Sequence, residues 1–329
     1  MVRRILTVLA VASFFVFFFD FSFAQKKTAK PTTKTSDKIV VTGPKVKIEK
    51  DYTLFERTPD KRPVATKESN YIEADTIKFF SAKNYTISEG NVVYRNYEKN
   101  IEIKAGYSEF YGNTGDVVFE KSPMMYLSNN NLYAGGNKVF MNVNQDKVSV
   151  DGNVFITNEN VRAFADKAEY VSKDNLSRMY GGVRIFSSNI NIKSDTAFFS
   201  IFSNNISNYI GYGNVVTETK NILARSEYLF ATFKNNNNID KYVLMTNVVV
   251  DGKDLYVEAF KMVGVVSNVV DGDKTNEVKF YTFTGFEKLV FYKDKKEDSV
   301  LECEVLEVIM DENNEMISST AKGKVKVIK

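Results

Sequence analysis

The chain has 329 residues, with 44 Lys and Arg against 41 Asp and Glu, so its formal net charge is +3. This balance makes no electrostatic case for a nucleic-acid-binding protein, and we expect no nucleic acid among its partners. Without histidine, the chain cannot use Ser-His-Asp or Cys-His catalysis or His-ligated metals. The single cysteine, Cys303, excludes an intramolecular disulfide and a Cys-rich zinc site. Carboxylate, lysine or tyrosine chemistry stays open, but we expect no enzyme, no cofactor and no metal site.

The first residues have the pattern of an export signal. Arg3 and Arg4 precede an apolar run, Ile5–Phe19, and Ala24 offers a small residue at the usual cleavage spacing. The run is shorter than the roughly 20 residues that a membrane-spanning helix needs. We therefore predict a cleaved signal peptide at residues 1–24 and an exported, soluble mature chain. An uncleaved membrane anchor is the alternative.

The next segment, residues 25–69, is rich in Lys, Thr and Pro and holds few large apolar residues. Such a segment cannot bury enough apolar surface to offset the entropy lost on ordering, so we predict a basic disordered tether. A basic tail that touches anionic lipid headgroups is the alternative. Within the segment, the run Lys38–Thr42 could add one strand.

The body of the chain, from Tyr71 onward, repeats one pattern. Ala-Asp-type pairs recur with their second residues at 75, 106, 136, 166, 195 and 226, which gives spacings of 31, 30, 30, 29 and 31. Gly-Asn-Val-type motifs start at 90, 152, 181, 213 and 246, at spacings of 62, 29, 32 and 33. The 62 is two periods, and its midpoint falls at Lys121. Two independent features with one period near 31 predict a repeat architecture.

The repeat unit is built of strands. Ile101 and Ile103 alternate with polar residues, as do Ile190 and Ile192, and Asn-rich clusters separate such segments. Aromatic residues make up 13% of the chain, which also favours strands. We predict two or three short strands per period. We interpret Gly-Asn-Val as a turn and strand start, and Ala-Asp as a turn or bulge.

The end of the chain follows the period less closely. After Gly252 the rhythm loosens, although Gly285 and Gly323 could continue it. We expect residues 264–329 to be atypical terminal repeats, which must manage an exposed sheet edge. Cys303 lies in an alternating segment and is expected in a strand. Asp271-Gly272-Asp273 hints at a calcium loop, but the EF-hand spacing fails and a turn is preferred.

The repeat resembles a known family. The sequence Tyr71–Asp75 followed by Ile87–Val92 resembles the OstA/LptA signature, and Arg162–Tyr170 followed by Met179–Val183 resembles a second copy. The resemblance covers roughly residues 71–252, and its specificity comes from repetition. It implies an all-β fold, a repeat-built β-jellyroll also described as a β-taco, over residues 70–263 and continuing through 264–329.

The same resemblance implies a function. Members of that family form part of the periplasmic bridge that carries lipopolysaccharide to the outer membrane, and they include LptA, the anchored LptC and the N-terminal domain of LptD. It therefore implies a periplasmic protein with lipopolysaccharide, lipooligosaccharide or a related glycolipid as cargo and LptC-like and LptD-like jellyrolls as partners. The chain is longer than a typical LptA and has a long basic N-terminal segment, so its position in such a bridge stays open.

The apolar residues of the alternating strands are either a dry core or the lining of a lipid groove. Shielding an acyl chain from water contributes about 0.8 kcal/mol per CH₂, so a long apolar groove would hold lipid strongly. The candidate groove residues are Val92, Ile101, Ile103, Val154, Ile156, Val183, Ile185, Ile190, Ile192, Val215, Val248, Val250 and Val257.

Two other function classes stay open. One is a structural β-repeat envelope or surface protein, such as an adhesin or stalk, with no lipid cargo. The other is a β-helical enzyme that acts on polysaccharide with paired carboxylates, although no particular pair stands out. An open repeat sheet also presents unpaired backbone at both ends, which predicts head-to-tail self-association, with Gly323–Val327 as a candidate edge.

Overall fold

The computed structural model describes residues 38–328 except 129–130, 160, 172–175, 188–189, 203–204, 234–238 and 272–273. These residues belong to one compact unit, residues 36–329. In this part of the chain, 26 strands form one hydrogen-bonded sheet, and the helical element is the short 3-10 turn η2, Ser81–Lys83. The predicted signal peptide and most of the basic segment, up to residue 37, lie outside the described residues.

The strands of the first half are β1 Val40–Thr42, β2 Lys45–Ile48, β3 Thr53–Glu56, β4 Val64–Lys67, β5 Asn70–Glu73, β6 Thr76–Phe80, β7 Tyr85–Asn96, β8 Ile101–Tyr111, β9 Asp116–Glu120, β10 Met124–Leu127, β11 Leu132–Gly135, β12 Lys138–Asn142 and β13 Lys147–Thr157. Those of the second half are β14 Val161–Val171, β15 Leu176–Ser187, β16 Asn191–Phe202, β17 Asn205–Glu218, β18 Ile222–Phe233, β19 Ile239–Gly252, β20 Leu255–Asp271, β21 Lys274–Thr284, β22 Val290–Asp294, β23 Ser299–Cys303, β24 Val305–Met310, β25 Met316–Lys322 and β26 Lys326–Ile328.

The sheet is folded over into two layers. The first part of β7, Tyr85–Glu89, pairs with β6, whereas its last part, Val93–Asn96, pairs with β5. The long strands β8 and β13 to β20 divide in the same way. Layer 1 holds one half of each long strand together with β1, β4, β5, β10, β11, β22, β23 and β26. Layer 2 holds the other halves together with β2, β3, β6, β9, β12, β21, β24 and β25.

The two layers meet at a row of corners. The register of β7 against β8 shifts so that Gly90 and Asn91, with φ of 76° and 43°, face the single residue Gly106. This is a β-bulge, which bends a strand. Paired positive φ angles recur at the corners Gly152–Asn153, Gly181–Gly182, Gly213–Asn214 and Thr246–Asn247.

The corners confirm the predicted period. Lys121 and Ser122, with φ of 61° and 60°, form the corner between β9 and β10, at the predicted midpoint of the 62-residue spacing. The chain is therefore an all-β, repeat-built β-jellyroll, as predicted. The interpretation of Gly-Asn-Val as a strand start is wrong, however. Strands such as β13 run straight through the motif, so from β13 to β20 a period holds two long strands.

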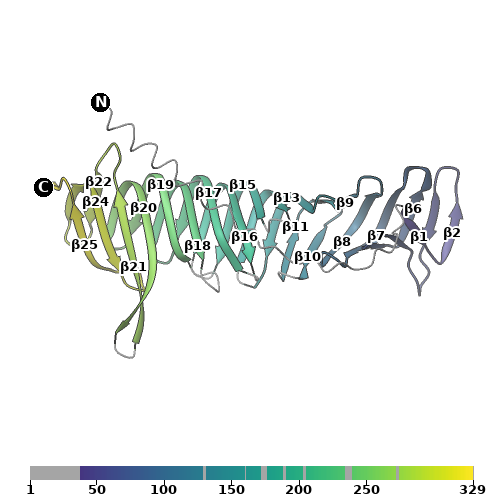
Figure 1. Cartoon of the computed structure of the whole chain (residues 1–329), viewed down its shortest axis with the longest axis horizontal. Helices are drawn as coiled ribbons and strands as arrows, with labels where there is room; N and C mark the ends of the chain where they lie inside the picture. The colour runs from purple at the N-terminus through teal and green to yellow at the C-terminus, as the bar shows by residue number, and fades with distance from the viewer. Residues whose placement is uncertain are drawn as a thin grey trace, which may run out of the picture. The chain divides into compact units, whose positions relative to one another are not determined.

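At the edge opposite the corners, the hairpin turns of the two layers face each other, and we call this edge the mouth. Figure 1 shows the strands following one another in chain order between β2 and β25, with the β20–β21 hairpin extending beyond its neighbours. The pairing explains that extension, because β20 leaves β19 at Val265 but stays paired with β21 as far as Asp271.

Two predicted domain boundaries do not match the strands. Strands β1 to β4 lie within residues 25–69, so the prediction of a disordered tether is wrong for residues 40–67. They are ordered because β4 pairs with β5 and β3 pairs with β6, which buries Ala65 and Phe55 against the first repeat. The boundary between residues 263 and 264 falls inside β20, which is continuous.

The core is one cluster of buried apolar side chains between the layers, from Ile39 to Met310. The alternation of apolar and polar residues along each strand places the apolar side chains between the layers, since successive residues of a strand point to opposite faces. Ile101 and Ile103 are buried while Lys104 is exposed, and Cys303 is a buried residue of β23, as expected of a strand residue.

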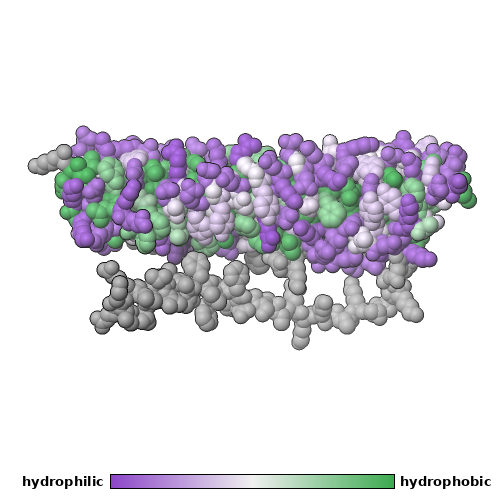
Figure 2. Space-filling view, turned by 90° about the horizontal axis from the view of Figure 1, so that it is seen from above, coloured by the Kyte–Doolittle hydropathy of each residue, from purple (hydrophilic) through white to green (hydrophobic). Residues whose placement is uncertain are grey.

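The outer face is mostly polar, and hydrophobic residues reach the surface near both ends of the sheet (Figure 2). At the first end, Ile48 of β2 is 83% exposed. At the other end, Ile317 of β25 and Val327 of β26 are 61% and 66% exposed. Each of these strands pairs with one neighbour, so its other edge is open.

Candidate functional site

The groove candidates chosen from the sequence form one wall of the interior. All of them are buried, with exposures from 0% for Val257 to 9% for Ile156. All belong to layer 1, because each lies on the layer 1 side of a corner. This wall consists mainly of β-branched aliphatic side chains. Whether it contacts lipid stays a prediction.

The facing wall, in layer 2, was missed by the sequence reasoning. Its buried side chains include valines and isoleucines, such as Val117 and Ile77, together with large aromatic rings and methionines. Examples of the latter are Phe110, Phe119, Met141, Met179, Phe199, Tyr209 and Phe283. The missed signal was alternation in segments away from the Gly-Asn-Val motif. In β9, for example, Val117 and Phe119 are buried while their neighbours are partly exposed.

The two walls touch in this structure. The rings of Tyr94 in layer 1 and Phe119 in layer 2 lie 5.4 Å apart, edge to face. The Tyr94 hydroxyl donates to Asn70 Oδ1 at 2.6 Å, and Asn96 Nδ2 donates to the same oxygen at 2.9 Å. These three polar side chains of the layer 1 wall are thus paired, and the two walls are in contact at Tyr94 and Phe119.

The interior tyrosines are uncharged at neutral pH. Burial raises the pKa of Tyr209 to about 12, although the hydrogen bond with Ser194 acts in the opposite direction. Burial likewise raises the pKa of Tyr281 to about 12. The space between the walls is therefore suited to neutral, apolar matter.

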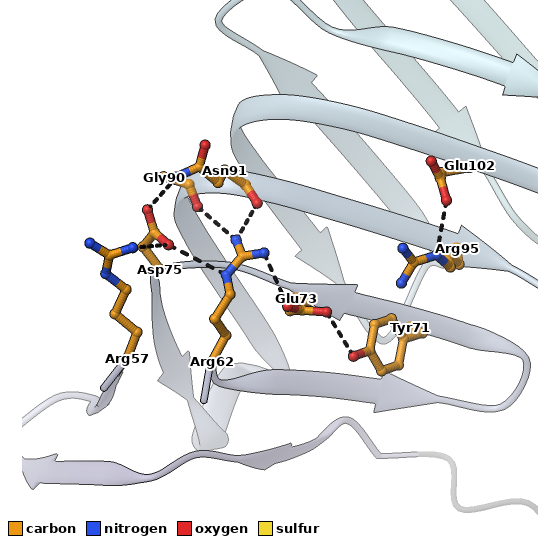
Figure 3. Close-up of polar contacts among 9 residues, drawn as sticks. All are labelled: Arg57, Arg62, Tyr71, Glu73, Asp75, Gly90, Asn91, Arg95 and Glu102. Atoms are coloured by element: carbon orange, nitrogen blue, oxygen red, sulfur yellow. Dashed lines mark hydrogen bonds and ion pairs between the residues drawn. The ribbon is translucent and has the colours of Figure 1, made fainter. Parts of the chain in front are cut away.

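Figure 3 shows the first corner that carries the sequence signature. Asn91 Nδ2 donates to Asp75 Oδ2 at 2.8 Å. Arg62 donates to the backbone carbonyl of Gly90 at 3.4 Å and to that of Asn91, and it forms an ion pair with Glu73 at 3.0 Å. The Ala-Asp and Gly-Asn-Val motifs therefore meet, and they hold the fold line between the layers.

The same bond recurs along the row of corners. Asn214 Nδ2 donates to Asp195 Oδ2 at 2.9 Å, and Asn153 Nδ2 donates to Asn137 Oδ1 at 3.3 Å. Asp195 is thus a corner residue, and the amide of Asn137 takes the same place at the earlier corner. Both agree with the turn or bulge role predicted for the Ala-Asp-type pairs.

At the corners the strands are continuous, whereas the mouth is held closed by hydrogen bonds and ion pairs of side chains. In the first half, Ile39 N donates to Asn84 Oδ1 at 2.9 Å. Lys67 Nζ donates to the carbonyl of Gly112, and Lys99 Nζ donates to the carbonyl of Val143 and pairs with Asp146. Each bond joins a layer 1 turn to a layer 2 turn.

In the second half, the turn between β24 and β25 closes the mouth. Lys253 Nζ lies 2.7 Å from Glu315 Oε1, and Met316 N donates to Asp254 Oδ2 at 3.1 Å. Burial raises the pKa of Asp254, but the Lys296 ammonium and the Met316 amide outweigh it, so the net shift is downward. Among the described residues, every hydrogen bond that we find across the mouth uses at least one side chain.

A polar cleft of about 660 Å³ interrupts the mouth where the turns after β15 and β17 face β21 and the β24–β25 turn. Its lining includes Glu218, Lys220, Lys279 and Asn314, with Ile190 of the core at its inner side. Lys279 Nζ donates to Asn314 Oδ1 at 2.6 Å. The cleft can therefore offer both donors and acceptors next to the apolar interior.

The part of the chain that the structure describes holds neither a metal-binding cluster nor a membrane-spanning helix. No group of three or more acidic or cysteine side chains there is placed to hold a metal ion. No helix there is long and apolar enough to cross a bilayer. Asp271 lies at the end of β20, and the rest of the weak calcium motif, residues 272–273, falls outside the described residues.

Comparisons with known proteins add little. No family model matches the chain, and no curated protein matches it. Among solved structures, the chain is similar to LptH from Pseudomonas aeruginosa, described as the LptA homologous periplasmic component of a lipopolysaccharide transport device. The match has 14% identity and a TM-score of 0.20, and it covers 44% of this chain and 82% of that one. The assignment of the fold rests on the strand pairing described above.

Proposed function

We propose that this chain is a periplasmic lipid carrier, a bridge component that holds lipopolysaccharide or a related glycolipid between its two layers on the way to the outer membrane. The observation that carries the proposal is the contrast between the two edges of the fold. Strands pass continuously through the corners, whereas the mouth is closed by side-chain bonds. The corners can serve as a hinge while the mouth parts.

The interior supplies the affinity that such a role needs. Its apolar cluster is continuous from Ile39 to Met310, so a chain bound at one end meets the same surface along the whole sheet. An acyl chain of a dozen carbons gains on the order of 10 kcal/mol when it leaves water. An exposed ion pair at the mouth, such as Lys253–Glu315, is worth about 0–1 kcal/mol and opposes this gain only weakly. Carriage of this kind needs no covalent chemistry.

The polar cleft supports an amphiphile as cargo. Acyl chains would lie between the walls, and the sugar headgroup would lie at the mouth, where Glu218, Lys220 and Asn314 can bond hydroxyl groups. The resemblance to the OstA/LptA signature, quoted above for residues 71–92 and 162–183, points to the same class of cargo. It also suggests LptC-like and LptD-like jellyrolls as partners at the open ends.

Mass spectrometry of lipid extracted from the full chain, purified from the envelope of its own cells, tests the proposal. We expect a glycolipid at a defined ratio to protein. The matched control is the Ile192→Asp variant, which places a carboxylate among apolar side chains and should lose the lipid. Circular dichroism must show that this variant keeps its strands. A wild-type protein that copurifies with no lipid would contradict the proposal.

One observation favours a second candidate. Walls that touch, as Tyr94 and Phe119 do, also suit a structural β-repeat protein of the envelope or surface, with a dry core and no cargo. Protease or dye accessibility in intact cells separates the two, because a surface stalk is labelled and a periplasmic carrier is protected.

A further inference from the structure

The layer 2 wall contains three buried hydroxyl groups that have no partner. Thr86 and Ser88 of β7 and Ser108 of β8 are each 0% exposed. Thr86 Oγ1, Ser88 Oγ and Ser108 Oγ have no hydrogen-bond partner in the structure. We call these three residues the hydroxyl seat.

The hydroxyl seat is contiguous. Ser88 lies directly opposite Ser108 in the register of β7 and β8, and Thr86 lies two residues from Ser88 on the same face. Directly opposed side chains have Cβ atoms about 4.5–5.5 Å apart, so one small group can reach more than one of these hydroxyls.

The surroundings of the hydroxyl seat are apolar. Ile77 and Phe79 are the register partners of Ser88 and Thr86 on β6, and Phe119 is the partner of Ser108 on β9. A buried hydroxyl without a partner destabilises the folded state, because it loses its hydrogen bonds to water. Among the described residues, one other buried hydroxyl, Thr217 Oγ1 in layer 1, also lacks a partner, but it stands alone. Other interior hydroxyls are paired; Ser194 Oγ, for example, lies 3.0 Å from the Tyr209 hydroxyl.

The chemistry limits what the hydroxyl seat can bind. A hydroxyl both donates and accepts, so it pairs with a carbonyl or with another hydroxyl. A charged group is disfavoured, because burying an ion among these apolar side chains without a counter-ion is costly. A polar group that binds to the hydroxyl seat must also be part of a hydrocarbon chain, because only an apolar chain fits between the walls.

We propose that Thr86, Ser88 and Ser108 form a binding site for a neutral oxygen-bearing group, a hydroxyl or a carbonyl, within an acyl chain. The proposal rests on the function proposed above, and it adds that the interior selects oxygenated chains over plain ones. It also fixes the position at which such a chain stops along the sheet, because among the described residues the other unpaired buried hydroxyl, Thr217 Oγ1, stands alone and is not part of a cluster.

Competitive binding of ricinoleic acid and oleic acid to the full chain tests the proposal, because the two differ by one mid-chain hydroxyl. We expect wild type to prefer ricinoleic acid several-fold, since a hydrogen bond contributes about 0.5–1.5 kcal/mol, a factor of about 2–12. In the variant T86V/S88A/S108A this preference should disappear while oleic acid still binds. The Tm of the ligand-free variant should rise, because unpaired buried hydroxyls have been removed.

Two controls complete the test. Ser194→Ala removes a paired interior hydroxyl, so it should lower the Tm and leave the preference unchanged. Thr86→Val alone, the most conservative change, should reduce the preference part of the way. Equal binding of both acids to wild type would overturn the proposal that the hydroxyl seat is a binding site. A triple variant that keeps the preference, or that has a lower Tm than wild type, would overturn it as well. If neither acid binds wild type, the lipid-carrier proposal fails as well.

Discussion

The side-chain amide of Asn91 donates a 2.8 Å hydrogen bond to Asp75, which lies beside it at the same corner on the neighbouring pass of the chain. This bond explains why two motifs of different composition share one period in the sequence. The acidic residue and the Gly-Asn pair lie side by side at the same corner, on neighbouring passes of the chain. Each long strand bends once, where it passes from one layer to the other, and that bend uses both motifs.

The corners predict which glycines the fold requires. Gly213 has φ of 71°, and a Cβ placed there would lie 2.4 Å from Asp195 Oδ2. Gly213→Ala should therefore lower the free energy of unfolding by about 1–2 kcal/mol from the left-handed backbone alone, and by more from the contact. Urea denaturation measures this change.

The matched control is Gly252→Ala, at a mouth turn. A Cβ there would find its nearest neighbour at 3.7 Å, an ordinary contact distance. We expect little change in stability. Equal losses in the two variants would mean that the corner does not depend on its backbone geometry.

Bonds across the mouth should control the rate of lipid uptake. Lys99→Met removes the bonds to the Val143 carbonyl and to Asp146 while keeping the apolar stem of the side chain. We expect faster loading of a fluorescent lipid in stopped-flow measurements, with a loss of stability of about 1 kcal/mol or less. Lys104→Met, on the outer face of the same repeat, should load at the wild-type rate. Unchanged loading in Lys99→Met would show that the mouth does not open there.

Acid should loosen the other half of the mouth. The folded-state pKa of Asp254 is lowered, so its carboxylate adds stability above its unfolded pKa, and that stability is lost as pH falls through the lowered folded-state pKa. Asp254→Asn should thus lower the Tm at neutral pH and flatten its decline below about pH 4, the ordinary range for aspartate. Asp298→Asn, at an 85% exposed side chain, is the control and should follow wild type. If the curves of Tm against pH were parallel for wild type and both variants, the Asp254 carboxylate would not be one of the groups that hold the mouth closed.

The open edges should let copies associate end to end. Val46→Pro in β2 removes a backbone N–H from the terminal strand, and it should shift sedimentation towards monomer. Tyr97→Lys changes a residue that is 63% exposed in a mouth turn away from both ends, and it should leave the distribution unchanged. Monomers at every concentration for wild type would contradict end-to-end pairing.

The period and the strand alternation were predictable from the sequence because both are local. The spacing placed a corner at Lys121, where no recognisable motif stands, and alternation placed Ile101 and Ile103 inside. The run Lys38–Thr42 was offered as a strand, and β1 lies there. Strands β2 to β4 were not predictable, because their order depends on pairing with the first repeat, through β5 and β6, rather than on their own composition.

The layer 2 wall was missed for a related reason. The sequence search followed valines and isoleucines beside the Gly-Asn-Val motif, and those lie in layer 1. The alternation of Val117 and Phe119 was visible in the sequence, whereas the place of Ser108 is known only from the register that sets it opposite Phe119. Polar residues inside a strand pattern look like solvent-facing positions until burial is known.

The most direct test of the central claim is site-specific photo-crosslinking in living cells along one strand of the interior wall. Ile190 and Ile192 are buried, while Asn191 is half-buried and Lys193 is exposed. A crosslinker placed at each position in turn should label glycolipid at residues 190 and 192 and not at 191 and 193, because side chains alternate between the interior and the outer face. Labelling of glycolipid on both faces alike, or crosslinks to protein alone, would contradict carriage of lipid between the two layers.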